Sequence, residues 1–189
     1  MLKEETRIDR YGYVRGVYEQ YGGSIFGHKT RNYRISPLRN RICKIWAKKR
    51  SNACAISQST NRVPHSRAEI YSDFVGVKAE WVFSQLQGCE MDRSTRPRKG
   101  GYDFLVDYMW LKLRVNVKGT DFFDPHLLVN KDQIHSDVDI YFLISVQGDL
   151  SRTFGWVFTD EIIRPELLTD RFESINYVLH NTDLRPPEG

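Results

Sequence analysis

The sequence predicts an α/β or α+β fold in which helices and strands pack as layers. Two observations carry this prediction. A long apolar helix pattern precedes a series of strand patterns, and a helix start signal follows the last of these strands. Hydrophobic residues make up 40% and aromatic residues 13% of the 189-residue chain, which excludes an intrinsically disordered chain. At about 150 residues per domain, the length indicates one domain with an appendage.

Charge divides the chain into a basic region, residues 1–68, and an acidic region, residues 69–189. The basic region holds 15 Lys and Arg against 4 Asp and Glu, a net of +11, and the acidic region holds 13 against 20, a net of −7. A basic arm on an acidic body indicates a polyanionic partner. We therefore predict a nucleic-acid-binding N-terminal region followed by a core with different chemistry.

Several classes of protein are excluded by the same inspection. No apolar run approaches the ~18–20 residues of a membrane span, and the N-terminus has no apolar stretch of the signal-peptide type. We therefore expect an intracellular, cytoplasmic protein with no membrane partner. The three cysteines, Cys43, Cys54 and Cys89, are odd in number and widely spaced, which disfavours a disulfide framework and a zinc site.

The N-terminal region shows little periodicity and is expected to be a mostly helical or irregular extension of the core. Its clearest element is a short basic amphipathic helix from Ser36-Pro37 to about Ser51. Serine suits the N-cap and proline the first helical position. Six basic side chains and no acidic one lie between Pro37 and Arg50, which favours contact with phosphates over a merely solvated helix face. These candidate DNA-binding residues are Arg39, Arg41, Lys44, Lys48, Lys49 and Arg50.

A second, mostly apolar helix is expected over about residues 71–86. Its narrow polar strip includes Glu80, so this carboxylate faces either a particular partner or a slot of solvent. A basic loop, residues 88–101, follows the helix and leads into the first predicted strand. The loop either holds a nucleic-acid backbone or is an ordinary flexible connection, and its candidate contacts are Arg96, Arg98 and Lys99.

Strand patterns then succeed one another along the acidic region. Residues 102–108 and 111–118 are expected to form neighbouring strands, and residues 138–146 the most apolar, central strand. Residues 153–158 form another strand, and Thr159-Asp160-Glu161 begins a helix that runs to about Leu168. The order is helix, three or four strands, helix.

Three polar residues lie where these strands are otherwise apolar. Asp103 begins the first strand, and Asn116 and Lys118 lie two residues apart near the end of the second, so they share one face. Hard divalent cations prefer oxygen ligands from one or two side chains and keep positions for water and phosphate. A nearby lysine can hold the attacking water while the cation stabilises charge on the phosphate. The pattern is typical of metal-assisted phosphodiester hydrolysis.

These residues carry a resemblance to a known family. Glu80 on a helix, then Gly101-Tyr102-Asp103-Phe104, then Val115-Asn116-Val117-Lys118-Gly119-Thr120, resembles the PD-(D/E)xK nuclease superfamily over residues 69–165. The resemblance implies a restriction-endonuclease-like mixed sheet flanked by helices. It also implies that Asp103 and the residue at position 116 bind Mg²⁺ or Mn²⁺, that Lys118 assists the nucleophilic water, and that Glu80 adds to the metal site.

Asn116 departs from the family pattern, which has Asp or Glu at this position. Asparagine keeps one oxygen and the shape of aspartate but lacks the charge that strengthens metal binding. Three interpretations are open: a nuclease that tolerates asparagine, a nuclease that has lost activity, and an inactivating Asp→Asn substitution. We favour the third because asparagine is isosteric with aspartate and the surrounding motif is kept.

The resulting hypothesis is a site-specific endonuclease of restriction, homing or phage type. It would hydrolyse double-stranded DNA with a divalent metal, and as a homodimer or larger homo-oligomer it would cut both strands. One alternative is a nuclease-fold DNA-binding protein without catalysis, and another is a Holliday-junction or repair nuclease. His126 and His135 suggest a histidine-based nuclease, but their surroundings favour a surface loop.

Overall fold

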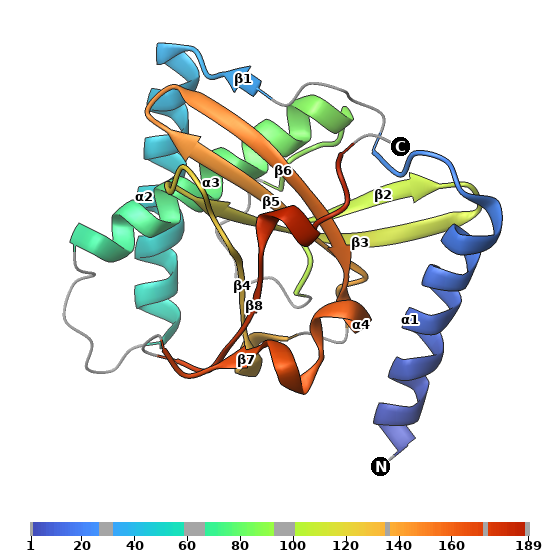
Figure 1. Ribbon diagram of the computed structural model, residues 1–189. Helices are drawn as coiled ribbons and strands as arrows, with labels where there is room; N and C mark the ends of the chain where they lie inside the picture. The colour runs from blue at the N-terminus through green and yellow to red at the C-terminus, as the bar shows by residue number, and fades with distance from the viewer. Residues whose placement is uncertain are drawn as a thin grey trace.

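The computed structural model describes residues 2–26, 32–58, 67–92, 101–134, 137–171 and 174–187. It shows an α+β protein in which a curled mixed sheet is flanked by helices (Figure 1), which confirms the predicted fold class at this level. Within these ranges, no helix has both the length and the apolar character needed to cross a membrane. The helices are α1 (Leu2–Tyr21), α2 (Pro37–Gln58), α3 (Arg67–Gln87) and α4 (Thr159–Ile162).

The larger sheet has five strands in the order β1-β6-β5-β3-β2. Strand β5 runs parallel to β3, and the other neighbouring pairs are antiparallel. A smaller antiparallel sheet has the order β4-β8-β7. The strands of the larger sheet are β1 (Asn32–Arg34), β2 (Phe104–Tyr108), β3 (Leu111–Thr120), β5 (Ile140–Gln147) and β6 (Leu150–Phe158), and those of the smaller sheet are β4 (Leu127–Asn130), β7 (Leu168–Thr169) and β8 (Asn176–Leu179).

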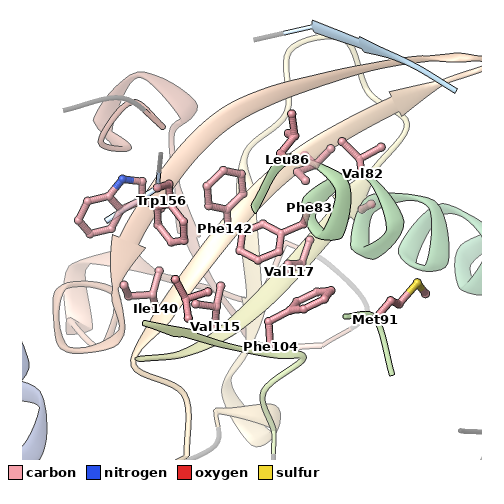
Figure 2. Packing of buried hydrophobic residues seen from close by; sticks show 14 of the residues in the cluster. Val82, Phe83, Leu86, Met91, Phe104, Val115, Val117, Ile140, Phe142 and Trp156 are labelled. Atoms are coloured by element: carbon pink, nitrogen blue, oxygen red, sulfur yellow. The ribbon is translucent and has the colours of Figure 1, made fainter. Parts of the chain in front are cut away.

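Helix α3 covers one face of the larger sheet. Phe83 of α3 packs among Phe104 of β2 and Phe142 of β5, with ring centroids 4.8 and 5.1 Å away (Figure 2). The helix approaches β3 closely because Gly119 has no side chain, since a Cβ atom there would lie 2.9 Å from the Cβ of Ala79. Burial of this apolar surface stabilises the fold by roughly 25 cal/mol per Å².

The opposite face of the sheet packs on the smaller sheet and α4. Tyr141 and Leu143 of β5 belong to this second core. The alternate residues of the same strand, Ile140 and Phe142, belong to the first core, on the face covered by α3. In the parallel register, Asn116 of β3 pairs with Tyr141 and Lys118 pairs with Leu143. Cross-strand neighbours share a face of a sheet, so Asn116 and Lys118 face the second core.

The basic N-terminal region is more regular than the sequence predicts. Residues 2–21 form α1, whose Val14 and Val17 are buried in the same core as α3 and the sheet, together with Ile35 and Cys43. Helix α2 begins as expected, with the backbone N–H of Arg39 donating to the Ser36 hydroxyl. It continues past the predicted end near Ser51 to Gln58. Residues 1–68 therefore contribute to the core that the acidic region builds.

The strand predictions agree with the structure to within a few residues, and the last helix does not. The helix expected from Thr159 to Leu168 ends at Ile162, and Pro165 then begins a 3₁₀ turn, because proline lacks the N–H that would continue the helix. The short strands of the smaller sheet were not predicted.

Candidate active site

Asp103 immediately precedes β2, at the end of the segment that pairs with β3. Its backbone N–H donates to the carbonyl of Val115 at 2.8 Å. Its Oδ2 accepts a hydrogen bond from the backbone N–H of Val117, also at 2.8 Å. The carboxylate therefore takes the place of a backbone partner at the open edge of β3, and the sheet fixes it beside the segment that carries Asn116 and Lys118.

The Asn116 side chain is satisfied on one side only. Its Nδ2 donates to the carbonyl of Gly101 at 2.6 Å, a bond that an ionised aspartate cannot make. Its Oδ1 is buried and accepts no hydrogen bond within the described part of the chain. Leaving a buried acceptor unpaired costs about 1–3 kcal/mol. The oxygen is thus a buried acceptor whose cost a bound cation would offset.

Lys118 lies on the same face of β3 as Asn116 and is half-buried. Its Nζ lies 5.8 Å from the centre of the Tyr141 ring. Burial lowers the pKa of the Lys118 amine below its ordinary value of 10.5, and the charge of Asp103 partly opposes this shift. Asp103, Asn116 and Lys118 therefore lie at the ends of two neighbouring strands, and we call these three residues the strand-end cluster.

Glu80 faces a particular partner, the first of the two alternatives that its place on the polar strip left open. The Arg50 guanidinium binds its two carboxylate oxygens at 2.7 and 2.8 Å and also donates to the carbonyl of Asp92 at 2.9 Å. Burial alone lowers the pKa of Arg50, and Glu80, with a smaller contribution from Asp103, raises it above its ordinary value. The charge of Glu80 is thus balanced by Arg50, whose pKa the charge of Asp103 also raises.

The candidate DNA-binding residues of α2 divide into two kinds. Arg50 is mostly buried against Glu80, so its charge is used within the protein. The other five are exposed, and two of them lie over aromatic rings of α3: Arg39 over Trp81 and Lys44 over Phe74. The exposed residues are Arg39, Arg41, Lys44, Lys48 and Lys49. The predicted loop residues Arg96, Arg98 and Lys99 lie outside the described residues.

The strand-end cluster offers oxygen donors that suit a hard divalent cation. Asp103 supplies carboxylate oxygens, and Asn116 supplies the buried, unpaired Oδ1 described above. The residues present therefore fit Mg²⁺ or Mn²⁺ with a small number of protein ligands. Among the described residues, no three His, Cys, Asp or Glu side chains are grouped so that they could hold a metal ion.

A cavity beside Lys118 was not anticipated from the sequence. It has a volume of about 320 Å³, and its lining includes Lys118, Phe122 and His126. The ring of His126 lies 4.7 Å from that of His180 at the start of a 3₁₀ turn, and His135 lies outside the described residues. The consecutive phenylalanines at positions 122 and 123, in a loop that follows the lysine of the motif, are the signal that could have revealed this site.

Comparison of the chain with models of protein families, with curated proteins and with solved structures found no match.

Proposed function

We propose that this protein is a divalent-metal-dependent DNA endonuclease of the PD-(D/E)xK type. The observation that carries the proposal is the strand-end cluster, in which a sheet-anchored carboxylate, a buried oxygen without a partner among the described residues and a lysine lie at the ends of two neighbouring strands. Oxygen donors beside a lysine suit the hydrolysis of a phosphodiester. The same residue types at the same places in the chain gave the resemblance noted from the sequence.

The chain's own groups would divide the work as follows. Asp103, oriented by the Val117 N–H, and Asn116 would hold the metal, which when bound supplies a Lewis acid for the phosphate. Lys118 would position the attacking water and stabilise negative charge on the phosphate. The exposed lysine and arginine side chains of α2 would neutralise phosphates of the DNA duplex. Contacts to phosphates do not depend on the DNA sequence.

The topology supports a restriction-endonuclease-like arrangement for the core. Helix α3 precedes the antiparallel hairpin of β2 and β3, and β5 then adds parallel to β3. The connection from β3 to β5 runs through β4 and a 3₁₀ turn, Lys131–Gln133, rather than through a long helix. The proposal of this fold rests on the order and direction of these elements around the strand-end cluster.

A second candidate function is DNA binding without cleavage. It is favoured by the hydrogen bond from Asn116 to Gly101, which only an uncharged side chain donates, and by the pairing of Glu80 with Arg50. In this case the exposed lysine and arginine side chains of α2 would form the DNA-binding surface, and the strand-end cluster would be a catalytic site that has lost its activity.

Cleavage assays distinguish the two candidates. The purified chain is incubated with Mg²⁺ or Mn²⁺ and a panel of plasmid, linear duplex and four-way-junction DNA, alongside Asn116→Asp, Lys118→Ala and Lys112→Ala. Lys112 is the control because it is an exposed lysine on the same strand. We expect metal-dependent cleavage that Asn116→Asp increases, that Lys118→Ala lowers by about 100-fold or more, and that Lys112→Ala leaves unchanged. Salt-sensitive binding with no cleavage by the wild type or by Asn116→Asp would establish the second candidate instead.

A further inference from the structure

The cavity beside Lys118 is bounded by the loop that joins β3 to β4. Its lining is mostly apolar, with Lys118 of the strand-end cluster at one side and three further polar residues, Thr120, Asp124 and His126. The apolar lining residues are Phe122, Pro125, Leu128 and Leu143. Lys118 thus belongs both to the lining of this cavity and to the cluster that we propose acts on the scissile phosphate.

The loop exposes an aromatic ring while its backbone is held in place. The side chain of Phe122 is 70% exposed. The Ser145 hydroxyl donates to the carbonyl of Phe122 at 2.6 Å, and the Phe122 N–H donates to the Thr120 hydroxyl at 3.3 Å. The Gln147 amide donates to the carbonyl of Asp121 at 3.2 Å. Because Phe122 also lines the cavity, this ring is available to a ligand that enters it.

We propose that this cavity receives one unpaired nucleobase, stacked on Phe122, from the nucleotide next to the phosphate that Lys118 faces. A flat aromatic ring and apolar walls suit the face of a base, and the lysine suits the adjoining phosphate. Bases within a duplex are covered by their neighbours, so a base must leave the stack to enter the cavity. The inference deepens the proposed function and rests on it: the preferred substrate is DNA with an unpaired flap or end at the cleavage site.

The polar side chains of the lining indicate how the base would be read. The Thr120 hydroxyl already accepts the N–H of Phe122, and the Asp124 carboxylate accepts a hydrogen bond from Asn181. Both groups already have a partner within the protein, and His126 lines the cavity beside the ring of His180, so stacking on Phe122 would be the main contact to the base. Stacking tolerates all four bases, and we therefore expect little dependence on the identity of the base in the cavity.

An affinity comparison without divalent metal tests the cavity separately from cleavage. Fluorescence anisotropy is measured with a duplex, the duplex with a short unpaired flap, and the same flap with abasic sites, which keeps its phosphates. We expect the flap to bind about tenfold more tightly than the abasic flap, because a stacked base contributes about 1–3 kcal/mol. Phe122→Ala should remove this difference. Phe123→Ala should keep it, since Phe123 is as exposed as Phe122 but lines another cavity, with Asn32 and Leu150.

Three outcomes would overturn the inference. They are equal affinity for the flap and the abasic flap, an equal loss of preference in both variants, and a change from dimer to monomer in Phe122→Ala with the flap preference intact. The last would show that a second copy of the chain covers the ring. Absence of cleavage of these DNAs with Mg²⁺ would overturn the proposed nuclease activity, while the abasic comparison would still decide the cavity. Thermal unfolding should show both variants within about 0.5 kcal/mol of the wild type.

Discussion

Two polar clusters lie along the same face of β3 and differ in how completely their groups are paired. At one end, Arg114 and Arg10 surround the buried carboxylate of Asp139. It accepts hydrogen bonds from both guanidiniums at 2.8–3.2 Å and one from the backbone N–H of Arg114 at 2.9 Å. At the other end, the strand-end cluster leaves the Oδ1 of Asn116 buried and unpaired within the described residues.

This difference in pairing indicates that the Asp139 cluster stabilises the fold and that the strand-end cluster binds a ligand. A buried carboxylate with two arginine partners holds α1 against the starts of β3 and β5, and little of its capacity remains for another molecule. A buried oxygen without a partner lowers stability, and a ligand that reaches it recovers that cost. We therefore expect changes to the Asp139 cluster to act on folding, and changes to the strand-end cluster to act on ligand binding and cleavage.

Asp139→Asn should cause the largest loss of stability, about 3–5 kcal/mol, because it leaves two arginines without their shared carboxylate. The lower part of this range is expected, since the Arg10 side chain is 43% exposed and solvent screens its charge. Urea unfolding of the variant and the wild type measures the difference. Asp107→Asn, which removes an exposed partner of Lys112, should cost less than about 1 kcal/mol.

The same cluster predicts a pH dependence. Burial alone raises the pKa of Asp139, but hydrogen bonds from Arg10 and Arg114 lower it below the ordinary value of 3.8. Its contribution to stability is therefore fully present above about pH 4 and is lost as the pH falls through the folded-state pKa. The stability difference between wild type and Asp139→Asn should shrink below pH 4. A constant difference across that range would contradict the account of this cluster.

Arg50→Met should cost less, about 2–3 kcal/mol, because it leaves Glu80 buried without its cation. Arg50 is 21% exposed, and solvent screening of the pair limits the loss. Lys49→Met, at the exposed neighbouring position of α2, is the control and should lower DNA affinity without changing the unfolding free energy. If Arg50→Met instead weakened DNA binding with stability unchanged, the pairing with Glu80 would not be the role of Arg50.

Asn116→Asp should cause a smaller loss of stability than Asp139→Asn or Arg50→Met, about 1–2 kcal/mol without metal, because the hydrogen bond to Gly101 is lost. Addition of Mn²⁺ should recover this loss and raise the melting temperature of the variant more than that of the wild type. Differential scanning calorimetry with and without Mn²⁺ measures both effects. A melting temperature of the variant that did not respond to Mn²⁺ would place the metal elsewhere.

The parts of the fold that the sequence predicts well are those with a strong local pattern. Alternation of apolar residues located β2 and β3, and the spacing of Asn116 and Lys118 placed them on one face. Helix α1 escaped prediction because Gly12, Gly16 and several tyrosines obscure its apolar positions, and its burial depends on Trp156 and Phe158 far along the chain. Strands as short as β7 have too few residues to show a period.

The candidate site was predictable only where it depends on neighbouring strands. The partner of Glu80 comes from α2, thirty positions earlier, and a helical pattern contains no information about which arginine will face it. Similarly, the sequence around Phe122 indicates only a loop. The structure shows that the Ser145 hydroxyl donates to the carbonyl of Phe122 and that Lys118 lines the same cavity as Phe122. Side-chain pairings between distant elements require the fold.

Mn²⁺ binding to the strand-end cluster, followed by electron paramagnetic resonance, tests the central claim most directly. Free Mn²⁺ has a strong signal that is lost on binding, so a titration gives the affinity without DNA or cleavage. We predict saturable binding by the wild type, at least about tenfold weaker binding by Asp103→Asn, and unchanged binding by Asp107→Asn, since the loss of a ligand carboxylate costs about 1.4 kcal/mol or more. Equal affinities for Asp103→Asn and the wild type would contradict the account.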